Sequence, residues 1–76
     1  MKYYILIFES MHKVMKAEKV LLSNGLKHEI VMTPKEITSD CGMSIRINPT
    51  IVNLNKISAS LKESKLEFKI FEKDIV

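Results

Sequence analysis

The chain has 76 residues, of which 46% are apolar and 28% are charged. This composition excludes a disordered chain and is typical of one globular domain, which we expect to span residues 1–76. Twelve basic residues against nine acidic ones give a net charge of +3, and because the lysines are scattered rather than clustered, we expect no nucleic-acid partner.

Residues 2–8, KYYILIF, form an apolar run rich in β-branched and aromatic types. The run predicts a strand buried on both faces, and hence a central strand of a sheet. It is far shorter than the roughly 20 residues needed to span a bilayer, and no signal-peptide pattern accompanies it. Because one cysteine excludes a disulfide framework, we expect a cytoplasmic protein with no membrane partner.

A helix is predicted to follow, with Ser10 as its N-cap. Asn24-Gly25 predicts the end of this helix, since glycine adopts the left-handed conformation needed just past a helix terminus. The apolar side chains expected on its buried face have the helical spacing of three and four residues and are Met11, Val14, Met15, Ala17, Leu21 and Leu22.

Residues 27–32 predict a second, shorter strand. Thr33, Pro34 and Glu36 then fit a capping box, which predicts one helical turn inside a loop that runs to Gly42. The next strand is expected to turn one face to the core and the other away from it. Its core-facing residues are Met43, Ile45 and Ile47, and those on the opposite face are Ser44 and Arg46.

Asn48-Pro49 predicts the start of a second helix, and residues 66–71 alternate as a last strand. The apolar stripe of this helix is Ile51, Leu54, Ile57 and Leu61. The order β-α-β-β-α-β predicts an α+β, ferredoxin-like sandwich, an antiparallel sheet with both helices on one face. One apolar side of the first strand then lacks a helix to cover it. Since exposed apolar sheet faces mark interfaces, we expect a homodimer through this open face.

The single cysteine, Cys41, comes at the start of the third strand. This strand neighbours the first one, so we expect Cys41 close to residues 9–12, where the amides and dipole of the first helix favour an anion. The dipole and His12 would lower the pKa of the thiol, whereas Asp40 would raise it. The sequence supports a reactive and an inert, packed cysteine equally. Gly42 either opens access to the sulfur or only forms a turn.

The segments FESMHKVMKAEKVL and TPKEITSDCGMSIRI resemble the small bacterial family of selenium/sulfur carrier-like proteins, over nearly the whole chain. The matching positions are Phe8-Glu9-Ser10, His12, Ala17-Glu18, Pro34-Lys35-Glu36-Ile37, Cys41-Gly42 and Arg46. Two departures are Lys35, where arginine is common, and Asp40, where a small hydroxyl residue often stands. The resemblance implies this family's fold and a thiol that carries sulfur or selenium.

Two functions follow as hypotheses. In the first, Cys41 takes a persulfide or selenopersulfide from a donor protein and passes it to an acceptor protein. The residues expected to bind there are Gly42, Ser39, Ser10, His12 and Lys35. In the second, the domain is a non-enzymatic ligand-sensing or protein-interaction module with an anion-binding edge. Both predict a carrier or binding protein rather than an independent enzyme.

The sequence predicts no cofactor and no metal site. A second cysteine near the first is absent, and His12 and His28 alone do not form a metal site. His28, on an edge strand, is expected at the surface. The methionines expected to fill the core rather than bind a soft metal are Met11, Met15, Met32 and Met43.

Overall fold

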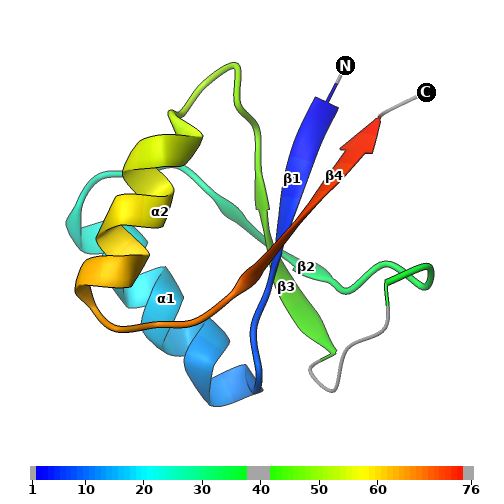
Figure 1. The fold of residues 1–76 in the computed structure, drawn as a ribbon, viewed down its shortest axis with the longest axis horizontal. Helices are drawn as coiled ribbons and strands as arrows, with labels where there is room; N and C mark the ends of the chain where they lie inside the picture. Colours follow the sequence, from blue (N-terminus) through cyan, green and yellow to red (C-terminus); the bar gives the residue numbers. More distant parts are fainter. Residues whose placement is uncertain (1, 38–41, 75–76) are drawn as a thin grey trace.

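The computed structural model describes residues 2–37 and 42–74 (Figure 1). Its elements follow the predicted order, β-α-β-β-α-β. They are β1 (Lys2–Ile7), α1 (Met11–Ser23), β2 (Glu29–Met32), β3 (Met43–Ile47), α2 (Leu54–Glu63) and β4 (Lys69–Asp74).

The four strands form one antiparallel sheet in the order β2-β3-β1-β4. Both helices cover one face of it, and residues 33–37, which follow β2, lie on the opposite side (Figure 1). The fold is therefore the predicted ferredoxin-like α+β sandwich, with β1 and β3 in the centre. Among the described residues, no helix is long and apolar enough to cross a membrane.

The boundaries of α1 were predicted correctly. Ser10 is its N-cap and accepts a hydrogen bond at 3.3 Å from the Lys13 amide. The helix ends at Asn24, and Gly25 follows with φ of +66°, the left-handed conformation that glycine adopts without steric cost. The Leu26 amide then donates to the Leu21 carbonyl oxygen at 2.9 Å, which closes the helix terminus.

The start of α2 was predicted too early. Asn48 caps only an isolated turn, because its side-chain oxygen accepts from the Thr50 amide and hydroxyl at 3.0 and 2.7 Å. The side chain of Asn53 accepts from the Asn55 and Lys56 amides at 2.7 and 3.3 Å, and Asn53 is the true N-cap of α2. Ile51, placed on the buried stripe by the early start, is in fact 61% exposed.

The main core lies between the helices and the sheet, and three predicted contributors from α1, Met11, Met15 and Leu22, are missing from it. Its buried residues are Leu6, Phe8, Val14, Ala17, Leu21, Ile45, Ile47, Ile57, Leu61 and Leu66. Met11 and Met15 are 49% and 57% exposed, and Met32 on β2 is 79% exposed. The prediction that methionines fill the core was wrong for these three, since they lie on one flank of α1 and on the edge strand next to it. It was correct for Met43, which is partly buried and packs against the main core.

A second apolar cluster covers the sheet face that the helices leave open. Ile37, from the segment after β2, packs with Ile5 and Ile7, and all three side chains are buried. Glu36 forms an ion pair with Lys73 of β4, so the same segment is attached to the far edge of the sheet. The exposed apolar face on which the predicted homodimer rested is therefore largely covered within one chain. The homodimer itself stays a prediction.

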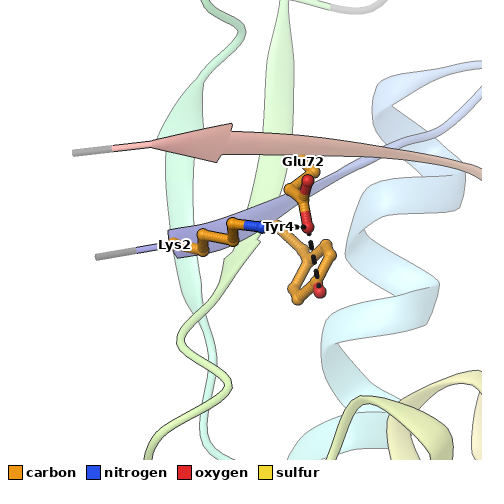
Figure 2. Close-up of polar contacts among 3 residues, drawn as sticks. All are labelled: Lys2, Tyr4 and Glu72. Atoms are coloured by element: carbon orange, nitrogen blue, oxygen red, sulfur yellow. Dashed lines mark hydrogen bonds and ion pairs between the residues drawn. The ribbon is translucent and has the colours of Figure 1, made fainter.

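Lys2, Tyr4 and Glu72 form a polar cluster at the end of the sheet where the chain enters β1 and leaves β4. Figure 2 shows the Lys2 ammonium and the Tyr4 hydroxyl both directed at the Glu72 carboxylate, at 3.6 and 3.4 Å from Oε1. Lys2 and Glu72 are more than half and about half exposed, so this cluster contributes little to stability. It joins β1 to β4 at the end of the sheet away from the start of α1.

Candidate functional site

The candidate site lies at the end of the sheet where β1 finishes, α1 begins and β3 starts. β1 and β3 pair antiparallel, with Leu6 opposite Ile45. Three more residues of this register would bring Glu9 opposite Gly42. The topology thus brings residues 9–12, which follow β1, and residues 42–43, at the start of β3, to the same end of the sheet.

Cys41 and Ser39, the predicted thiol and one predicted binding residue, lie outside the described residues, as does Asp40. Gly42, bonded to Cys41, is described and exposed. A Cβ built on Gly42 would meet no atom within 4 Å, and its φ is not in the left-handed region. Neither close packing nor backbone strain requires glycine there, so the structure leaves open space beside the residue that follows the cysteine.

The start of α1 provides the positive end of a helix dipole at this edge. No acidic residue lies in the first turn, which instead contains His12 and Lys13. The first amides of a helix have no carbonyl partner within it and attract anions. The Ser10 oxygen accepts from the Lys13 amide, which occupies one of the helix's first amides. Glu9 is exposed just before the cap.

His12 is exposed on the first turn, and Lys35 is exposed in the turn after β2. Within the described part of the chain, no hydrogen bond or ion pair joins either side chain to Ser10 or Gly42. The structure therefore brings Ser10, His12 and Gly42 to one end of the sheet by topology. It gives no direct contact that would assign Lys35 to the same site.

The base of the cysteine-bearing segment is closed by two hydrogen bonds. The Thr33 amide donates to the Gly42 carbonyl oxygen at 2.9 Å, and the hydroxyls of Thr33 and Ser44 lie 2.6 Å apart. The predicted capping box does not form, because the Thr33 hydroxyl meets Ser44 and Glu36 pairs with Lys73. The predicted turn itself is present, and the Ile37 amide donates to the Pro34 carbonyl oxygen at 3.0 Å.

Sequence reasoning missed the residues that fix this segment. Ser44 was assigned correctly to the face opposite Ile45, but it is fully buried rather than solvated. Ile37 was treated as part of a polar loop, yet it is 8% exposed against the sheet. A lone isoleucine among polar residues in TPKEITSD was the available signal, since an apolar side chain in a loop needs a place to be buried.

A wide, open groove of about 940 Å³ begins at the same end of the sheet. It is lined by the end of β1, by α2 and by residues 66–71, and Glu9 is on its rim next to Ile7 and Phe8. Its walls combine apolar side chains with Lys62, Glu67 and Lys69 on the surface. The groove is open rather than enclosed, and it adjoins the candidate site through Glu9.

A smaller pocket of about 410 Å³ lies at the other end, between the C-terminus of α1 and the start of β2. His28 lines it, and its side chain is only 4% exposed, so the predicted surface position was wrong. Its Nδ1 donates to the Leu26 carbonyl oxygen at 2.9 Å, and Nε2 lies 3.8 Å from the Glu18 carboxylate. Among the described residues, no group of three His, Cys, Asp or Glu side chains could hold a metal ion.

Comparison with known proteins gives one match. The family model described as Putative Se/S carrier protein-like matches residues 3–72. No curated protein and no solved structure matches the chain. The match covers both segments on which the resemblance rested, together with all of the helices and strands except the first residue of β1 and the last two of β4. The chain belongs to the Se/S carrier protein-like family.

Proposed function

We propose that the protein carries sulfane sulfur or selenium on Cys41. The observation that supports this most is family membership over residues 3–72, since the family is described as Se/S carrier-like and the chain has one cysteine. The protein acts as a carrier between a donor and an acceptor protein rather than as an independent enzyme. A reducing cytoplasm is the compartment that suits its single thiol.

The chemical step is thiol exchange at sulfur. The Cys41 thiolate attacks the terminal sulfur of a donor persulfide, R–S–SH, and forms Cys41–S–SH while R–S⁻ leaves. The outer atom is then attacked by an acceptor thiolate, and the Cys41 thiolate is regenerated. With R–S–SeH the same step yields Cys41–S–SeH. A carrier with one cysteine has no second thiol to collapse the persulfide into an intramolecular disulfide.

Three features of the described residues support this role. The open space at Gly42 leaves room for a bulky donor. The first turn of α1, without acidic residues, favours the negative charge of a thiolate or persulfide. Ser10 and His12 lie on that turn or its cap and would steady the anion, while Ser39 and Lys35 would meet the partner protein. The groove beginning at Glu9 offers that partner an adjoining surface.

Thiol alkylation against pH tests the proposal first. We expect native Cys41 to react rapidly, with a midpoint well below the ordinary thiol pKa of about 8.5. Incubation with a persulfide donor should then add the mass of one sulfur atom, which a reductant removes. Cys41→Ser is the matched control and should gain nothing. A thiol that reacts only after unfolding would overturn the carrier role.

The second candidate is a ligand-sensing or protein-interaction module in which Cys41 only packs. The observation that favours it is the same α1 N-terminus, with His12 and Lys13 in place of acidic residues. The occupant there would be a carboxylate or phosphate group. Cys41→Ser separates the two functions, because it abolishes carriage and leaves such binding intact.

A further inference from the structure

Five of the eight large apolar side chains that are exposed in the described part of the chain lie on one side of the molecule, where α1 lies beside the edge strand β2. On α1, Met11, Met15 and Leu22 are 49%, 57% and 65% exposed. On β2, Ile30 and Met32 are 36% and 79% exposed. Methionine is common at protein-binding surfaces because its flexible side chain adapts to a partner. These five residues are called the methionine edge below.

The α1 side of this surface faces β2. Met11, Met15, Glu18 and Leu22 follow one another at spacings of four, three and four residues, so they form one stripe along the helix. Glu18, in the middle of this stripe, contacts His28, the residue just before β2. The stripe therefore lies on the side of α1 next to β2 and away from α2.

The backbone of β2 also has its outer side open. β2 is the first strand in the sheet order and pairs only with β3 among the described strands. The hydrogen bond from the Thr33 amide to the Gly42 carbonyl sets the phase of this ladder. Because bonded and non-bonded pairs alternate in antiparallel sheets, Val31 and Glu29 turn their backbone groups to β3. Ile30 and Met32 turn theirs outward.

The two edges of the sheet differ in their protection against pairing with another chain. Edge strands usually bear charged residues or proline that discourage such pairing. The other edge, β4, has the sequence KIFEKD, in which four of six residues are charged. β2 has the sequence EIVM, and its one charge, Glu29, is paired with Arg46 at 2.6 Å. Ile30, Val31 and Met32 leave this edge unprotected.

We propose that β2 pairs antiparallel with β2 of a second copy of this chain, about a twofold axis at Val31. This register places Ile30 opposite the partner's Met32 and Met32 opposite the partner's Ile30. Both residues point their N–H and C=O groups outward, so each pair exchanges two backbone hydrogen bonds. The apolar side chains match apolar ones on the helix side, and Val31 meets the partner's Val31 on the other side.

A second copy fits this edge because the edge complements itself. The twofold register satisfies the outward backbone groups of Ile30 and Met32 and covers the two most accessible apolar positions of β2 in one step. It also brings the α1 parts of the two methionine edges, Met11, Met15 and Leu22 of each copy, to the same side of an eight-stranded sheet. The interface differs from the open sheet face, where Ile37 already covers Ile5 and Ile7.

The test is the mass of the full chain in reducing buffer, which prevents a disulfide through Cys41. Sedimentation equilibrium at micromolar concentrations should give twice the 8.8 kDa chain mass. Met32→Lys should weaken the dimer by about a hundredfold or more, because the change occurs twice per dimer and each lost apolar contact is worth about tenfold. Ile70→Lys, at a 43% exposed position of the other edge, is the matched control and should dimerise normally.

A second variant and a second measurement separate pairing from side-chain contact. Met32→Pro removes an outward N–H without removing a bond to β3, so it should abolish the dimer and leave the monomer folded by circular dichroism. Amide exchange of Ile30 and Met32 should slow as the protein concentration rises. A wild-type monomer at about 100 μM, or a dimer that tolerates Met32→Pro or is broken by Ile70→Lys, would overturn the proposal.

Discussion

Ile37→Ala tests whether the segment after β2 is attached to the sheet as the structure describes. The side chain is 8% exposed and packs with Ile5 and Ile7. Truncation of a buried isoleucine costs about 2–5 kcal/mol. Because Ile37 belongs to a small cluster beneath a loop, which can partly collapse, we expect the lower limit of this range, about 2 kcal/mol.

That loss would be a large share of the stability of this protein. A chain of 76 residues is stable by about 4–11 kcal/mol at typical values per residue. A loss of about 2 kcal/mol would lower Tm by about 8–16 °C, since each kcal/mol shifts a domain of this size by about 4–8 °C. Urea denaturation followed by circular dichroism measures the change directly, with the midpoint moving and the slope constant.

The control for this experiment is Ile51→Ala, which removes the same atoms from a side chain that is 61% exposed. It should change the free energy of unfolding by less than about 0.5 kcal/mol. If Ile37→Ala were equally harmless, Ile37 would not pack on the sheet in solution. Ile5 and Ile7 would then lie open, and the sheet face would again be the better candidate for the homodimer interface.

Three further predictions concern the helix ends and the surface. Lys65 has φ of +60° just after α2, so Lys65→Gly should raise Tm by several degrees, whereas Gly25→Ala at φ of +66° should lower it by a similar amount. Asn53→Ala should cost about 1 kcal/mol as the loss of an N-cap, and Asn48→Ala should leave the helix content of α2 unchanged in circular dichroism. Glu72→Gln should change the urea midpoint little, because the Glu72 and Lys2 side chains are half exposed or more; a loss above about 1 kcal/mol would contradict this.

The order of elements and the sheet topology could be predicted from sequence because each of these features is marked by a local sequence pattern that agrees with the observed fold. The continuous run of β1 predicted its central place, and Ser10 and Gly25 predicted both ends of α1. The start of α2 was mistaken because two asparagines compete as caps. Asn48 closes a turn, and only the amides taken by Asn53 continue as a helix.

The sides of α1 and the role of the loop were harder to predict for a different reason. The helical spacing places Met11 and Met15 next to Val14 on the apolar side of α1. It does not show how much of that side the sheet covers. That width depends on β2, which is short and at the sheet edge, so it leaves Met11 and Met15 exposed. The burial of Ile37 depends on Ile5 and Ile7, which come 32 and 30 positions earlier in the chain, and no local pattern encodes such a contact.

The proposed carrier site and the proposed dimer interface lie on different parts of the fold, so each proposal can be tested without the other. Gly42 and the start of α1 lie at one end of the sheet, while the backbone groups proposed to pair two copies point sideways from Ile30 and Met32. Antiparallel pairing about Val31 turns the two copies in opposite directions, so their Gly42 ends would face opposite ways along the joined sheet. A monomeric Met32→Pro should therefore still accept sulfur on Cys41, and Cys41→Ser should still dimerise. Loss of sulfur transfer in Met32→Pro would mean that carriage requires the dimer, and loss of the dimer in Cys41→Ser would mean that the two surfaces are coupled.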